Sequence, residues 1–220
     1  MKFVYLSPSV SQEMRLLRKE IALSMNGVLA ESLEKQGLSY KRNYGVVVSR
    51  LCEIARRHAA DSVLAEALWC SGEREFMLLA CMLQPHNEFT FDSAKKWLKQ
   101  VHNVELAEQV SFRLFSRLVF AVDVAEYALQ QENEWQKLVA LYILPRVVKN
   151  MNEEQRKSLL DKVLSLLDTE YNLLFQAAVN VMQHFCEEQA ELATYCMNCL
   201  QLEQYPQRQA YVNMMMDGLV

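Results

Sequence analysis

The chain has 220 residues, of which 51% are hydrophobic, and it contains only five glycines and four prolines. A chain of this length can bury a large core, but it lacks the turn residues that an all-β or α/β fold requires. No apolar run reaches the ~18 residues that span a bilayer, and no apolar segment with a cleavage site opens the chain. We therefore expect an almost wholly helical, cytoplasmic protein.

The net charge of −4 conceals a gradient along the chain. Residues 1–60 carry ten Lys/Arg against five Asp/Glu, whereas residues 161–220 carry two against eight. A basic N-terminal third can neutralise phosphates on one side of a helical protein. The same residues can equally form the solvated faces of amphipathic helices. The acidic C-terminal third favours a protein partner instead, so both kinds of partner stay open.

Apolar residues recur at helical spacing between short polar junctions along the whole chain. This pattern predicts helices at residues 9–25, 27–36, 45–59, 61–70, 73–84, 91–102, 104–119, 122–131, 134–149, 152–168, 170–186, 188–202 and 206–217. Short connections indicate antiparallel neighbours, and each helix pair occupies roughly 35–40 residues. We expect one domain, residues 1–220, built as a right-handed solenoid of stacked pairs with a continuous core.

Residues 61–84 give the clearest local signal. Asp61 is a good N-cap, and Ser71-Gly72 supplies a left-handed stop before a second helix that ends at Pro85. The segment is therefore an αα-hairpin, which cannot bury its apolar face alone and has to stack on others. Elsewhere, Asn152 to Gln155 reads as a capping box, and Gly37 and Gly218 read as helix stops.

Several stretches of the chain share a pattern with one family. They are Leu68-Trp69, Glu73-Arg74-Glu75-Phe76, Asn43-Tyr44-Gly45-Val46 and Val101 to Glu108. Over about residues 10–200 the sequence resembles the AlkD-type DNA alkylation-repair glycosylases. The resemblance implies an all-α fold, a HEAT-like helical-repeat solenoid (α-α superhelix). It also implies that the glycine at position 45 lets the chain turn sharply into the next helix.

The resemblance further implies a reaction, hydrolysis of the N-glycosidic bond of an alkylated base. The resembling enzymes hold the lesion between aromatic walls, stabilise charge with a carboxylate and grip the backbone with an arginine. Their Trp-x-x-x-Asp falls here at Val104 and Glu108, so the carboxylate is kept but lengthened by a methylene. Their arginine falls at Leu138, beside Lys137, and their second tryptophan at Val181. Valine offers no π face to a cationic base.

These replacements predict an AlkD-like, repair-related protein that binds DNA, alkylated or distorted, through a concave basic groove, with weak or absent glycosylase activity. Glu108 is the candidate catalytic residue. The candidate DNA-binding residues are Arg15, Arg18, Arg50, Arg56, Arg113, Arg117 and Lys137. One alternative is an active glycosylase for alkylated purines in which Glu108 has other aromatic support. Another is a HEAT-repeat scaffold for a protein partner.

Other side chains with chemical potential are better explained by packing. Trp69, Trp97 and Trp135 lie at helical spacing among apolar neighbours, so we expect them in the core. His184-x-Cys186 with Cys196-x-x-Cys199 offers four zinc donors, but i, i+2 residues on a helix point to different sides. Six scattered cysteines therefore favour reduced, buried thiols, and we expect no metal and no cofactor.

Overall fold

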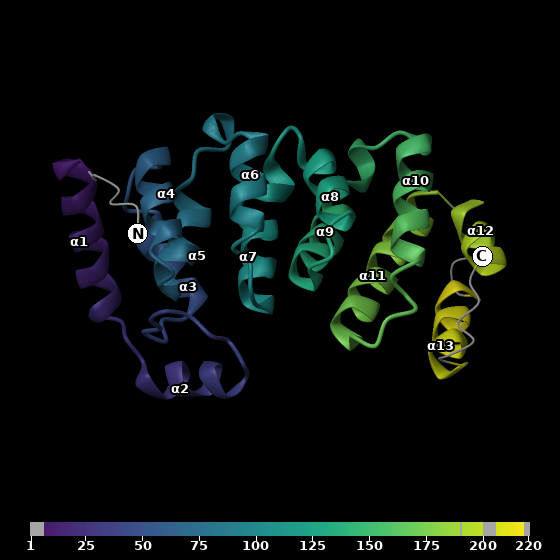
Figure 1. The fold of residues 1–220 in the computed structure, drawn as a ribbon, viewed down its shortest axis with the longest axis horizontal. Helices are drawn as coiled ribbons and strands as arrows, with labels where there is room; N and C mark the ends of the chain where they lie inside the picture. Colours follow the sequence, from purple (N-terminus) through teal and green to yellow (C-terminus); the bar gives the residue numbers. More distant parts are fainter. Residues whose placement is uncertain (1–6, 190, 200–205, 218–220) are drawn as a thin grey trace. The chain divides into compact units, whose positions relative to one another are not determined.

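The computed structural model describes residues 7–189, 191–199 and 206–217, and these are almost entirely helical (Figure 1). They form two compact units, Met1–Leu118 and Val119–Val220. No β-strand occurs in the described residues, whose sole extended pairing is a bridge between Arg42 and Glu73. The all-helical prediction is therefore confirmed. The single domain and the right-handed superhelical path stay predictions.

The helices of unit 1 are α1 (Pro8–Ala22), α2 (Gly27–Lys35), α3 (Val48–Ala55), α4 (Ser62–Cys70), α5 (Arg74–Leu83), α6 (Phe91–Leu98) and α7 (Val104–Arg113), with short 3-10 turns η1 (His86–Glu88) and η2 (Phe115–Arg117). Within this unit, α4 packs on α5, and α5 contacts α3 on one side and α7 on the other. Nine of the ten residues of α5 are buried, which explains why its sequence is apolar on all faces.

The hairpin predicted at residues 61–84 forms as expected. The Asp61 carboxylate accepts the Leu64 N–H at 2.7 Å and so caps α4. Gly72 follows this helix with a φ of 71°, the left-handed conformation that glycine adopts without steric cost. The hairpin also supports an aromatic core, in which Trp69 and Trp97 stack with ring centroids 4.2 Å apart. Both rings are fully buried, as predicted, whereas Trp135 in unit 2 is half-buried.

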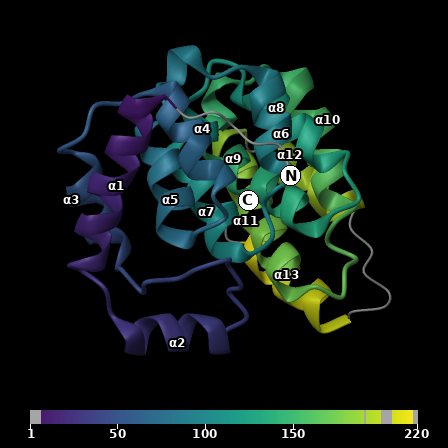
Figure 2. The same cartoon turned by 60° about the vertical axis from the view of Figure 1, so that its left-hand side comes forward.

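The third helix is shorter than predicted. It begins at Val48 instead of residue 45, because Gly45 has a φ of 68° and the chain stays extended after it. A side chain at this position would meet the Asn26 carbonyl oxygen at 2.0 Å and the Ala30 nitrogen at 2.6 Å. Glycine is therefore required here, and the predicted sharp turn is confirmed. Figures 1 and 2 show α2, which buries none of its residues completely, lying across the ends of its neighbours.

Two further helices of unit 1 end early. The predicted helix 91–102 stops at Leu98, and the predicted helix 104–119 stops at Arg113. After α7 the chain tightens into η2, whose Phe115 is fully buried. A buried aromatic side chain at this point fixes the path of the chain more strongly than helix propensity does, so the last turns of the predicted helix are redirected.

The helices of unit 2 are α8 (Ala121–Leu129), α9 (Glu134–Val147), α10 (Glu153–Leu164), α11 (Asn172–Glu188), α12 (Glu191–Cys199) and α13 (Pro206–Asp217), with η3 (Val148–Asn150) after α9. Helix α9 contacts α8 and α11, and α10 packs on α11. The predicted capping box at Asn152 and Gln155 is present. Gly218, expected as a helix stop, lies outside the described residues. Across the described chain, none of the helices combines the length and the apolar character needed to cross a bilayer; the cytoplasmic location stays a prediction.

Candidate nucleic-acid interface

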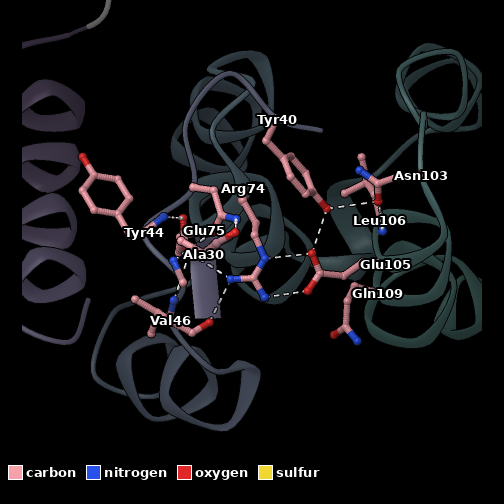
Figure 3. A network of polar contacts seen from close by, with 12 residues as sticks. Ala30, Tyr40, Tyr44, Val46, Arg74, Glu75, Asn103, Glu105, Leu106 and Gln109 are labelled. Carbon is pink, nitrogen blue, oxygen red and sulfur yellow. Dashed lines mark hydrogen bonds and ion pairs between the residues drawn. The ribbon is translucent and has the colours of Figure 1, made fainter. Parts of the chain in front are cut away.

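The N-terminal ends of α5 and α7 meet in a buried network of charges (Figure 3). Arg74, which is 2% exposed, donates two hydrogen bonds to the Glu105 carboxylate, at 2.8 and 2.5 Å. It also donates to Glu75 and to the Val46 carbonyl oxygen, both at 2.9 Å. Burial alone would lower the pKa of Arg74, but the bonds and charges of its carboxylate partners raise it above its ordinary value.

The same network holds the loop that precedes α3. The fully buried Glu75 carboxylate accepts the backbone N–H groups of Tyr44 and Val46, each at 3.1 Å. The Tyr40 hydroxyl lies 2.9 Å from Glu105 Oε2, and its pKa is raised by burial and by that carboxylate's charge. Loop, α5 and α7 are thereby fixed to one another. The Glu-Arg-Glu-Phe pattern that carried the family resemblance is thus a structural element that positions α7.

Two of the predicted DNA-binding arginines have carboxylate partners. Arg18 makes a two-pronged ion pair with Glu73, at 2.6 and 3.0 Å, and this hydrogen bonding raises its pKa. Arg50 bonds Glu53 at 2.6 Å and the Ser24 hydroxyl at 3.1 Å. Arg15 lies exposed on α1. A role in DNA binding stays a prediction for all three, but neutralised guanidiniums contribute less to an anion site than free ones.

The C-terminal ends of α3, α5 and α7 surround an open pocket of about 370 Å³, which we call the arginine pocket. It is lined by Cys52, Ala55, Arg56, Ala60, Met82, Gln84, Pro85, His86, Arg113 and Arg117. Three predicted DNA-binding residues, Arg56, Arg113 and Arg117, therefore share one site. Cations are favoured here because the negative ends of three helix dipoles converge, so the helices help to hold the charges together.

Little in the arginine pocket neutralises these charges. Arg113 Nε donates to the neutral Gln109 side chain at 3.2 Å, and Arg56 and Arg117 are exposed. Among the residues that the structure describes, no Asp or Glu lines the pocket. His86 Nε2 lies 3.3 Å from the Arg113 carbonyl oxygen, which places the imidazole at the pocket wall. The site is therefore a concentrated, solvent-accessible positive charge.

The predicted catalytic carboxylate lies apart from this pocket lining. Glu108 is exposed on α7 and is not among the residues that line the pocket. Lys137, the remaining predicted DNA-binding residue, belongs to α9 of unit 2 and is half-buried. Of the positions where the resembling enzymes carry their arginine and second tryptophan, Leu138 is 1% and Val181 0% exposed. Both are core residues here.

The described residues contain no cluster of three or more His, Cys, Asp or Glu suited to a metal ion. Cys186 and Cys196 lie with their sulfur atoms 4.0 Å apart and are buried, whereas Cys199 is exposed. The His184 Nδ1 atom lies 2.9 Å from the Asn180 carbonyl oxygen of its own helix. The hydrogen bond between the two thiols lowers the pKa of Cys186 and raises the pKa of Cys196. The two cysteines are therefore partners of each other.

Sequence reasoning missed several residues of both sites. Pro85 and His86 lie just after the C-terminal end of α5, and Arg56 and Arg113 lie at the C-terminal ends of α3 and α7. The proline that ends α5 was the signal in the sequence that could have placed His86 beside these arginines. The spacing of Glu105, Gln109 and Arg113, four residues apart, places them along one face of α7. That face connects the buried network at one end of the helix to the arginine pocket at the other.

Comparisons with known proteins agree with this architecture. The sequence model of a family described as "DNA alkylation repair enzyme" matches residues 17–193. A solved structure described as "A new family of proteins related to the HEAT-like repeat DNA glycosylases with affinity for branched DNA structures" is similar, with a TM-score of 0.74 and 13% identity. The match covers 93% of this chain and 94% of that one, which confirms the HEAT-like repeat fold. No curated protein matches the sequence.

Proposed function

Because the chain belongs to the DNA alkylation repair enzyme family, we propose that it binds DNA through the arginine pocket of unit 1. We further propose that it excises alkylated bases weakly or not at all. The observation that carries the first proposal is the convergence of Arg56, Arg113 and Arg117 on one site without a carboxylate among its described lining. Guanidinium groups match the geometry of phosphate oxygens, and phosphate contacts supply most of the sequence-independent affinity for DNA.

The structural relative supports a particular kind of DNA. Its description gives it affinity for branched DNA, and branched DNA brings several phosphate backbones close together. A compact cluster of cations is best used where the density of phosphates is highest, because each neutralised phosphate releases a counterion. We therefore propose branched or otherwise distorted DNA, rather than an undamaged linear duplex, as the preferred partner.

Weak excision is proposed from the surroundings of Glu108. A catalytic carboxylate works when neighbouring groups hold it in a water-poor, preorganised site. Glu108 is exposed, and the aromatic wall that the family places one helical turn before it is replaced by Val104. Trp69 and Trp97 are both committed to the core. The carboxylate is retained without the partners that would make it effective.

The experiment compares two triple variants in fluorescence-anisotropy titrations over a range of salt concentrations. The test variant is Arg56→Ala/Arg113→Ala/Arg117→Ala, and the control is Lys95→Ala/Lys96→Ala/Lys99→Ala, which removes the same charge from α6 and its C-terminal end in the same unit. The probes are a four-way junction and a linear duplex of the same sequence. We expect the wild type to favour the junction, with an affinity that falls steeply with salt.

In the test variant the slope of log affinity against log salt should fall by about 0.9 for each phosphate that is no longer neutralised, whereas the control should keep the wild-type slope. Equal losses in both variants would mean that only net charge matters and would contradict a site at the pocket. Absence of salt-dependent binding to either DNA would remove the DNA proposal and favour the protein-interaction scaffold.

A further inference from the structure

The arginine pocket is larger than phosphate contacts alone require. Its volume is about 370 Å³, whereas a phosphate group occupies the space of a few water molecules, each of which takes ~30 Å³ in the liquid. Pockets of ~300–1,000 Å³ are typical of sites that enclose small organic ligands. A single phosphate would fill only part of this open pocket, so there is room beside it for a larger ligand group.

The lining of the pocket is also mixed in character. Beside the three arginines stand Cys52, Ala55, Ala60, Met82 and Pro85. An apolar wall next to cations suits a ligand that is anionic at one end and flat and weakly polar at the other. Methionine adapts its shape to such a surface because its side chain is unbranched and polarisable. A nucleotide has this distribution of charge and shape.

His86 adds a ring surface at a fixed position. It begins η1, directly after Pro85, and is exposed at the pocket wall. The same turn is anchored by Phe89, which is 6% exposed and packs edge-on against Trp97 with ring centroids 5.0 Å apart. The imidazole is therefore held by a turn that is attached to the aromatic core. Histidine rings and arginine planes are surfaces on which unpaired bases stack.

We propose that the arginine pocket holds one unpaired nucleotide of the bound DNA, an inference that rests on the proposed function. The phosphate of this nucleotide lies on the arginines, and its base lies against His86 and the apolar wall. A paired base must first leave its stack, which costs free energy, whereas a branch point or bulge supplies an unpaired nucleotide at lower cost. The pocket thus gives a physical reason for preferring distorted DNA.

The test uses three duplexes of one sequence: fully paired, with a single-nucleotide bulge, and with the same bulge carrying a tetrahydrofuran abasic analogue. All three are titrated by fluorescence anisotropy. The two bulged duplexes have the same phosphates and differ only in the extra base. We expect the bulge to bind about 10-fold more tightly than the paired duplex, in the range of stacking on a protein ring. The abasic bulge should return to the paired affinity.

Two substitutions of one residue make the test specific to the ring. His86→Ala should lose the preference for the bulge, about 10-fold, while binding the paired duplex as the wild type does. His86→Phe keeps a ring and should keep the preference. Because His86 is exposed, neither change should lower the melting temperature, which is measured as a folding control.

The two proposals fail in different ways. If Arg56→Ala/Arg113→Ala/Arg117→Ala weakens binding but the wild type binds the three duplexes equally, the pocket takes phosphates alone. DNA binding through the arginine pocket then stands, whereas the nucleotide site and the preference for bulged DNA are both overturned. The nucleotide site is also overturned if His86→Ala retains the full preference for the bulge. If the triple variant binds every duplex as the wild type does, the proposed function itself is overturned.

Discussion

Arginines at the two ends of the α3, α5 and α7 layer in unit 1 have opposite surroundings. At the N-terminal ends, Arg74 is buried and bonded to Glu75 and Glu105. At the C-terminal ends, Arg56 and Arg117 are exposed beside a pocket that has no acidic lining among the described residues. In the first arrangement the guanidinium is paired with carboxylates and joins elements of the fold, whereas in the second the positive charge stays available to a ligand. Residue type alone does not separate these roles. What separates them is whether the guanidinium is saturated, that is, already paired with carboxylates.

The largest effect on stability is expected from breaking the network of Arg74, Glu75 and Glu105, which we call the saturated end. Arg74→Met removes the cation from between two carboxylates and leaves them without their partner in the interior. Loss of one member of a buried charge network typically costs about 3–5 kcal/mol. Urea unfolding should therefore show a much lower midpoint with an unchanged m-value.

The matched control for Arg74→Met is Arg117→Ala at the open end. This change should alter the free energy of unfolding by no more than ~0.5 kcal/mol, since it removes an exposed side chain. Arg117→Ala should instead weaken the affinity for DNA, because it removes a charge from the arginine pocket. Equal stability of the two variants would contradict the division of the arginines into structural and binding groups.

The fold was predictable because its determinants are local. Apolar spacing, the Asp61 cap and the Gly72 stop each act within a few residues, and all thirteen predicted helices have counterparts among the described helices. The helix ends near residues 45 and 113 were predicted less well. There, contacts with distant segments decide the path, as the approach of Gly45 to Asn26 and Ala30 shows.

The candidate site was only partly predictable, for the same physical reason. Arg18 and Arg56 belong to similar basic stretches of the sequence. Arg18 pairs with Glu73, which is 55 residues away, and nothing in the sequence around either arginine indicates this pairing. Glu105 was overlooked beside Glu108, although it is the carboxylate of α7 that the network uses. Charge saturation depends on tertiary contacts, so it becomes visible only in the folded chain.

A smaller loss of stability should come from the loop that the saturated end holds in place. In Gly45→Ala the new methyl group would overlap the backbone of Asn26 and Ala30, at a φ of 68°. We expect a loss of about 3 kcal/mol, from strain and steric overlap together. Circular dichroism melting of the purified variant measures it.

Gly37→Ala separates the two contributions to that loss. Gly37 has a φ of 83°, but a side chain there would meet nothing within 4 Å. Its substitution should cost only the left-handed penalty of about 1–2 kcal/mol. If Gly37→Ala and Gly45→Ala melt at the same temperature, the close approach of Gly45 to Asn26 and Ala30 contributes nothing measurable to stability.

The smallest effect is expected at Glu108, which belongs to neither end. Its carboxylate is exposed on α7. The family resemblance predicts that the groups expected to act together with it are replaced at Val104, Leu138 and Val181, and the last two are core residues. Groups that act as a unit lose their effect together, so a remaining carboxylate contributes little by itself.

Chromatographic assay of free bases released from methylated DNA should therefore give near-background rates for the wild type. Glu108→Gln should be indistinguishable from it in release, in DNA binding and in stability. Robust release of a methylated purine that disappears in Glu108→Gln would overturn this prediction, because it would show the carboxylate working with aromatic partners elsewhere on the molecule.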